Sequence, residues 1–197
     1  MLVFPNAKLV FLSMPKTGTT AYEAALAPYA AMTILDPPAL KHASVFRYGR
    51  FFKPMMDKFV HPRLELMAVI REPVSWLHSW YRYRQRPFLN GKPNSTAGIS
   101  FDDFVKACML PKRPAFADVG TQIGFLKPHP DGAHVQHLFR YEDQAAIITF
   151  LETRLGTRLD LKRENVSPAK PLQLSDNVRA AYQSFAREEF DLWNATR

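Results

Sequence analysis

The sequence predicts an α/β fold in which helices flank a central parallel sheet. Three apolar runs, residues 9–12, 64–70 and 135–139, are each followed by turn-forming residues and then by a helical pattern. The first two runs lack polar alternation, which is typical of strands buried on both faces of a parallel sheet. With 197 residues, 47% of them hydrophobic, the chain suits one domain covering residues 1–197.

The other boundaries follow from residues that stop or start regular structure. Prolines at 37 and 38 stop a possible strand, and Pro73 opens a helix because proline is tolerated at the first helical position. In the first half we expect a strand at 9–12, a helix at 21–26, a possible strand at 32–35, an ambiguous segment at 40–52, a helical turn at 55–59, and a strand at 64–70. In the second half we expect a helix at 74–84, an exposed loop or substrate lid at 86–100, and a helix capped by Ser100. Irregular chain at 111–132 should lead to a strand at 135–139 and a helix at 143–155 ended by Gly156. The last expected element is a terminal helix capped by Ser175, with Val178, Tyr182, Phe185 and Trp193 along one stripe.

The turn between the first strand and its helix has the composition of an anion site. A helix start leaves backbone N–H groups without partners and carries partial positive charge, so it suits a phosphate or sulfate group. Lys16 adds a full charge, Gly18 allows close approach, and Thr17, Thr19 and Thr20 offer hydroxyl groups. The alternative is a capped helix start with an incidental lysine.

This turn is not a Walker A loop. That pattern needs an early glycine and a Gly-Lys-Ser/Thr ending, whereas here Lys16 precedes Gly18, and Ser13 stands where the early glycine would be sought. The departure disfavours a nucleoside-triphosphate loop of the usual kind.

A second candidate anion site follows the strand at 64–70. Arg71 lies at the exit of that strand, and Ser79 lies eight residues further on, in the next helix. Arginine offers a planar fork for phosphate and serine a hydroxyl donor. Since parallel strands end at the same edge of a sheet, this pair and the Lys16 turn should share one edge, which implies a doubly phosphorylated ligand.

Three segments resemble, in the right order, motifs of the sulfotransferases that use 3′-phosphoadenosine 5′-phosphosulfate (PAPS). PKTGTT at 15–20 resembles the family's 5′-phosphosulfate loop, REPVSWLHS at 71–79 resembles its 3′-phosphate motif, and RYED at 140–143 resembles the segment whose tyrosine, here Tyr141, contacts the adenine. ENVSP at 164–168 and REEFDLW at 187–193 look like the Golgi and bacterial glycan sulfotransferases. The resemblance implies a P-loop-NTPase-like three-layer fold, although the RKG-type segment of the cytosolic members is missing, and only Lys162, Arg163 or Lys170 could substitute for it.

The resemblance also implies a mechanism that needs no metal. Lys16 would stabilise the departing phosphate, residues 17–20 would hold the 5′-phosphate, and PAPS would be the co-substrate. LKHAS at 40–44 resembles the segment that carries the family's catalytic histidine, which makes His42 the candidate general base. Competing bases are His61, His78 and Glu72, and a structural role for His42 is the alternative.

Composition narrows the partners without choosing among them. A formal net charge of +8 favours polyanionic partners, and an anionic carbohydrate is a suitable sulfate acceptor. No nucleic-acid-binding motif, signal peptide or membrane-spanning run is recognised, so we expect a cytoplasmic enzyme that binds no nucleic acid. The single cysteine, Cys108, lies in an apolar setting and is expected to be a core thiol.

Two other functions remain as alternatives. The first is a P-loop small-molecule kinase, disfavoured by the missing Walker glycine and by the lack of a strand ending in aspartate. The second is a non-catalytic polyanion-binding protein that uses the arginines between Arg82 and Arg86.

Overall fold

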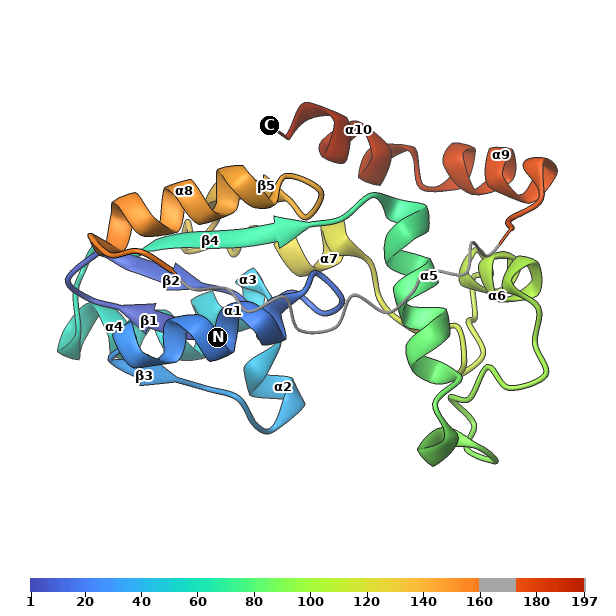
Figure 1. Cartoon of the computed structure of the whole chain (residues 1–197), viewed down its shortest axis with the longest axis horizontal. Coiled ribbons are helices and arrows are strands. Elements are labelled where there is room, and N and C mark those ends of the chain that lie inside the picture. The colour runs from blue at the N-terminus through green and yellow to red at the C-terminus, as the bar shows by residue number, and fades with distance from the viewer. Residues whose placement is uncertain (160–172, 197) are drawn as a thin grey trace. The chain divides into compact units, whose positions relative to one another are not determined.

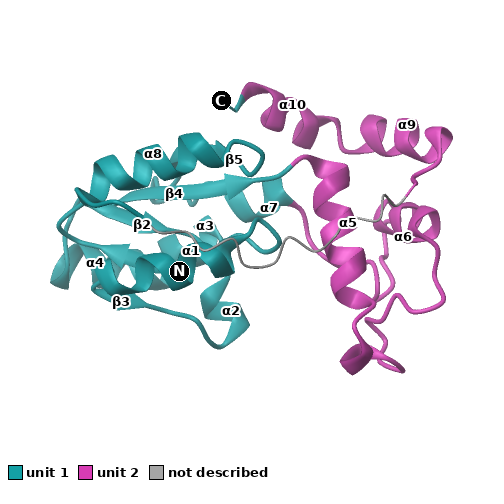
Figure 2. Cartoon of the chain, viewed as in Figure 1, with its two compact units in different colours: residues 1–71, 122–166, 196–197 teal, residues 72–121, 167–195 magenta. Residues whose placement is uncertain are grey.

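The computed structural model describes residues 1–159 and 173–196, which form two compact units (Figures 1 and 2). Among the described residues, unit 1 comprises 1–71, 122–159 and 196, and unit 2 comprises 72–121 and 173–195. The single domain expected from chain length stays a prediction. The ENVSP segment at 164–168 and the three candidate substitutes at 162, 163 and 170 lie outside the described residues.

A five-stranded mixed sheet forms the centre of unit 1. Its strands are β1 (Leu2–Phe4), β2 (Leu9–Phe11), β3 (Met32–Thr33), β4 (Glu65–Ile70) and β5 (Val135–Arg140), in the spatial order β3-β1-β2-β4-β5. The pairs β2–β4 and β4–β5 are parallel, as predicted, whereas β1 runs antiparallel to both β2 and β3. The sheet is therefore not wholly parallel, because the four residues between β1 and β2 can close a tight turn but cannot make a crossover.

Helices cover both faces of this sheet (Figure 1). On one face, alternate strand residues such as Phe4 and Phe11 pack with α1 (Thr19–Leu26) and α8 (Gln144–Leu155). On the other face, Val3 and Val10 pack with α3 (Val45–Arg47), the π-helical η2 (Tyr48–Phe52) and α4 (Lys53–Phe59). The remaining helices of unit 1 are short: η1 (Ala27–Tyr29), α2 (Pro38–Lys41) and α7 (Gln122–Leu126).

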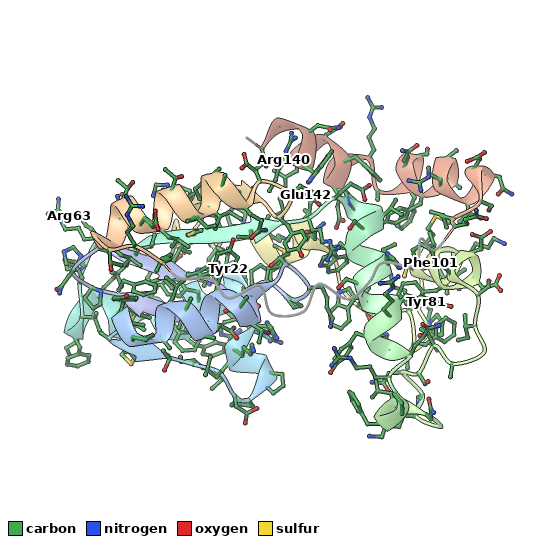
Figure 3. All side chains as sticks on the ribbon, viewed as in Figure 1. Tyr22, Arg63, Tyr81, Phe101, Arg140 and Glu142 are labelled. Carbon is green, nitrogen blue, oxygen red and sulfur yellow. The ribbon has the colours of Figure 1, made fainter. Side chains whose placement is uncertain are left out.

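Unit 2 is helical and has its own aromatic core. Its helices are α5 (Pro73–Arg84), η3 (Pro87–Leu89), α6 (Phe101–Cys108), α9 (Asp176–Phe185) and α10 (Arg187–Ala195). Tyr81 of α5 packs on Phe101 of α6 with ring centroids 5.2 Å apart (Figure 3), and Val178 and Tyr182 of α9 complete the cluster. The predicted cap is confirmed, since the Ser100 side chain accepts a hydrogen bond from the Asp103 N–H at 3.1 Å.

The C-terminal end differs from the single helix expected there. The chain breaks at Ala186 between α9 and α10, so the predicted single stripe is wrong for Trp193, which lies on α10, whereas Val178, Tyr182 and Phe185 share α9. Phe185 is 53% exposed. Ser175 occupies the N-cap position of α9, but its hydroxyl bonds to Asp102 and Asn177 and caps no helical N–H. A competing tertiary contact has replaced the local cap.

The loop at 86–100 is tied to α5 by several hydrogen bonds, two of them made by Thr96 and another from the Tyr81 hydroxyl to the Ile99 carbonyl at 2.6 Å. Thr96 is fully buried, its hydroxyl donates to the Tyr81 carbonyl at 2.9 Å, and its N–H donates to the Arg84 carbonyl at 3.1 Å. A buried anchor of this kind favours the surface connection over the substrate lid. Across residues 1–159 and 173–196, no helix is both long enough and apolar enough to cross a bilayer.

The predicted core thiol is confirmed and gives a chemical test of unit 2. Cys108 is 3% exposed, and burial raises its pKa to about 12. At mildly alkaline pH its thiolate fraction should be on the order of a thousandfold below that of a free cysteine. We expect no reaction with Ellman's reagent in the folded chain and one reactive thiol in concentrated guanidinium chloride. Rapid reaction of the folded chain would contradict this packing.

Candidate functional site

Three neighbouring parallel strands end at the same edge of the unit 1 sheet, and each is followed by residues singled out from the sequence. The Lys16 turn follows β2, Arg71 follows β4, and Tyr141 follows β5. Because β4 pairs in parallel with both β2 and β5, all three exits point the same way. The predicted common edge is confirmed for the Lys16 turn and Arg71.

The turn before α1 has a backbone suited to anion binding. Lys16 has φ 68° and Gly18 has φ 73°, so two left-handed residues flank Thr17. Turns with left-handed residues before a helix are typical of anion-binding nests, in which successive N–H groups converge. Left-handed backbone at a lysine costs about 1–2 kcal/mol, and such strain clusters at functional sites.

The hydroxyl groups of the turn are arranged differently from the prediction. Thr17 is fully buried and donates to the Met14 carbonyl at 2.9 Å, so its hydroxyl braces the turn from inside. Thr19 is 5% exposed, Thr20 is exposed, and α1 has no side-chain cap. The Thr17 hydroxyl is therefore engaged within the turn and is not offered to an anion.

Arg71 joins the turn to the end of β5. Its Nη1 donates to the Lys16 carbonyl at 3.4 Å, and its guanidinium lies 4.4 Å from the centre of the Tyr141 ring. Gln122, 3% exposed, clamps the arginine backbone by accepting from the Arg71 N–H and donating to the Arg71 carbonyl, both at 2.8 Å. No signal in the sequence marked Gln122, which lies in a stretch predicted to be irregular.

Tyr141 fixes how close the turn comes to β5. Its backbone N–H donates to the Ile70 carbonyl at 2.6 Å, which continues the pairing of β5 with β4. A Cβ atom added to Gly18 would lie 2.8 Å from Tyr141 Cε2, closer than side chains pack. One ring face carries Arg71, so that face is not open to a stacked purine.

His42 is hydrogen-bonded to the segment between β2 and α1, which also contains Lys16. Its Nδ1 lies 2.7 Å from the Ser13 carbonyl oxygen, and since a carbonyl only accepts, Nδ1 carries the proton and Nε2 keeps a lone pair when the ring is neutral. Burial lowers the pKa of His42, although the bond to Ser13 opposes this effect. A 2.8 Å ion pair between Lys41 and the buried Glu23 fastens α2 to α1.

The competing bases have other partners. His61 Nδ1 accepts from the Arg63 N–H at 3.1 Å, and the Glu72 carboxylate accepts from the Ser75 N–H at 2.6 Å, which caps α5. In unit 2, His78 packs 5.5 Å from Phe101 between ring centroids. Ser79 lies half-buried on α5 in the same unit, so its pairing with Arg71 of unit 1 stays a prediction.

The arginine cluster proposed for polyanion binding is partly structural. Arg84 is 8% exposed, and its guanidinium donates to the Ala115 and Asp118 carbonyls at 2.7 and 2.8 Å. Burial lowers its pKa. This arginine holds the 115–118 segment against α5 and does not point at a solvent-borne anion.

Comparisons with known proteins assign the chain to no family: no family model, no curated protein and no solved structure matches it. Within the described part of the chain, no three His, Cys, Asp or Glu side chains gather as a metal site.

Gly18→Ala tests the approach of the turn to Tyr141. Gly98, with φ 78° and nothing within 4 Å of an added Cβ, is the matched control because it isolates the cost of the left-handed backbone. Gly18→Ala should lower the free energy of unfolding by about 1–3 kcal/mol more than Gly98→Ala, since the ring must move as well. Urea unfolding measures both, and the excess should vanish in a Tyr141→Ala background. Equal costs in the parent chain would contradict the contact.

Proposed function

We propose that the protein is a PAPS-dependent sulfotransferase built on a P-loop-NTPase-like fold. The observation that carries the proposal is the convergence of the Lys16 turn, Arg71 and Tyr141 at the ends of three adjacent parallel strands. Open α/β sheets bind ligands beyond the carboxyl ends of their strands. One residue from each motif that resembles the sulfotransferases therefore lies at the sheet edge where such folds bind ligands, which supports the proposal.

The turn would bind the 5′-phosphosulfate. The nest between the left-handed Lys16 and Gly18 and the start of α1 supply N–H groups and partial positive charge without any side-chain rearrangement. Lys16 adds the charge that a departing phosphate needs. Preorganised donors of this kind act on the transition state at little reorganisation cost.

Arg71 would bind the 3′-phosphate. Its guanidinium already touches the Lys16 carbonyl, so the two proposed phosphate sites are neighbours, as one adenosine bisphosphate requires. Gln122 holds the arginine backbone and Tyr141 supports the guanidinium plane, which leaves little freedom to lose on binding. Tyr141 would then contact the adenine through its edge or hydroxyl.

His42 would serve as the general base. The acceptor hydroxyl oxygen attacks sulfur, the bond between sulfur and the 5′-phosphate oxygen breaks, and Nε2 of His42 takes the hydroxyl proton. The products are a sulfate ester and adenosine 3′,5′-bisphosphate, whose new charge is stabilised by Lys16. The acceptor class that suits the net charge of +8 is a hydroxyl or amine of an anionic carbohydrate.

Ligand-induced stabilisation separates this proposal from the kinase alternative. Adenosine 3′,5′-bisphosphate at about a hundredfold excess over its Kd should raise Tm by roughly 5–10 °C, and ATP with magnesium should raise it far less. Arg71→Ala should remove the difference, whereas Arg63→Ala, an exposed arginine of the same unit (Figure 3), should leave it intact. A larger shift with ATP and magnesium would favour the kinase.

The pH dependence of sulfate transfer tests His42. A general base must be neutral, and the lowered pKa keeps His42 neutral below its ordinary value of about 6.5. With an acceptor found by labelled-sulfate transfer to glycans, phenols and lipids, kcat/KM should stay level down to about pH 6.5 and fall only below it.

His42→Asn should lower kcat/KM by about 10²–10⁴-fold and abolish this acidic limb. His61→Asn, the matched histidine of the same unit, should change neither the rate nor the limb. If the limb persists in His42→Asn while the variant still melts cooperatively, another group is the base.

A further inference from the structure

We infer that the exposed face of η2 and α4 docks unit 1 onto a lipid bilayer that contains anionic headgroups, a property independent of the proposed sulfate transfer. Phe51, Met55 and Phe59 are spaced by four residues and therefore share one helical stripe. They are 63%, 39% and 74% exposed. A single exposed phenylalanine is ordinary, but three large apolar side chains in register are a surface that water does not favour.

The adjacent stripe of the same segment already forms the core. Tyr48 and Met56 are 2% and 0% exposed and pack with Val3 and Val10 of the sheet. The segment is thus held to unit 1 by one apolar face while it presents a second apolar face outward. Burial in the core requires the first of these faces to be apolar, whereas Phe51 and Phe59 of the second keep most of their surface exposed among the described residues.

The excess of positive charge around the exposed stripe of Phe51, Met55 and Phe59 favours an anionic partner. Residues 46–63 contain five basic side chains and one acidic side chain, and that acid, Asp57, is paired with Lys53 at 2.5 Å. Arg50 and Lys58, both exposed, flank the stripe, each with its cationic group 5.2 Å from the centre of a phenylalanine ring. Arg63 is exposed four residues after α4.

The charge pattern favours an anionic bilayer over a protein partner. Phenylalanine, methionine and arginine are common in protein interfaces, but lysine is depleted there, whereas this segment contains Lys53 and Lys58 and its one acidic side chain is paired. A helix in the membrane interface inserts its apolar side chains among the acyl chains and keeps basic groups at headgroup level, as these alternating residues would do.

Vesicle sedimentation with the full chain tests the inference. The chain should pellet with vesicles of phosphatidylcholine and phosphatidylserine, and much less with phosphatidylcholine alone or in high salt. Phe51→Ser/Phe59→Ser should lower the partition coefficient about ten- to hundredfold. The control Phe88→Ser/Phe185→Ser, two unit 2 residues 55% and 53% exposed, should leave it unchanged.

Two outcomes would overturn the inference. One is the absence of serine-lipid-dependent pelleting by a chain that melts cooperatively. The other is full retention of binding by Phe51→Ser/Phe59→Ser while Arg50→Glu/Lys58→Glu abolishes both vesicle and heparin binding, which would indicate a polyanion surface without insertion. Since the four substituted side chains are exposed, the variants should fold, and a thermal melt checks this.

Discussion

The site depends on the contact between the Arg71 guanidinium and the Lys16 carbonyl, because it joins two segments 55 residues apart. The contact is possible only because β2 and β4 are adjacent and parallel, so their exits share an edge. The Arg71 guanidinium contacts the Lys16 carbonyl and the Tyr141 ring, and the Gln122 side chain bonds to its backbone. Without this convergence, the turn would be an ordinary strained helix start.

Local chemistry explains what the sequence could predict of the fold. The runs around β2, β4 and β5, the Ser100 cap and the left-handed Gly156 after α8 each depend on a few consecutive residues, and the structure places them as expected. Other features depend on distant partners. The strand β1 is too short to show a pattern, and the mixed sheet follows from its tight turn into β2.

In the candidate site, too, some features could be predicted from nearby residues, whereas others depend on contacts between distant residues. Residue types and positions singled out Lys16 and Arg71, because oxyanion chemistry requires such groups at strand exits, whereas Tyr141 came from the resemblance of RYED to a sulfotransferase segment. Spacing could not show that Thr17 turns its hydroxyl inward, or that the face of Tyr141 is covered by a guanidinium. Nor could it show Gln122, whose role arises from a contact across 51 residues. Such details depend on tertiary packing, which no local pattern encodes.

The buried state of the only cysteine has a practical consequence. Because Cys108 is enclosed and strongly disfavours its thiolate, a cysteine introduced elsewhere can be labelled with a maleimide fluorophore without first removing the native one. A donor and acceptor dye pair, one on each unit, would then report distances between the two units in solution by energy transfer. The chain is in this respect already prepared for single-molecule spectroscopy.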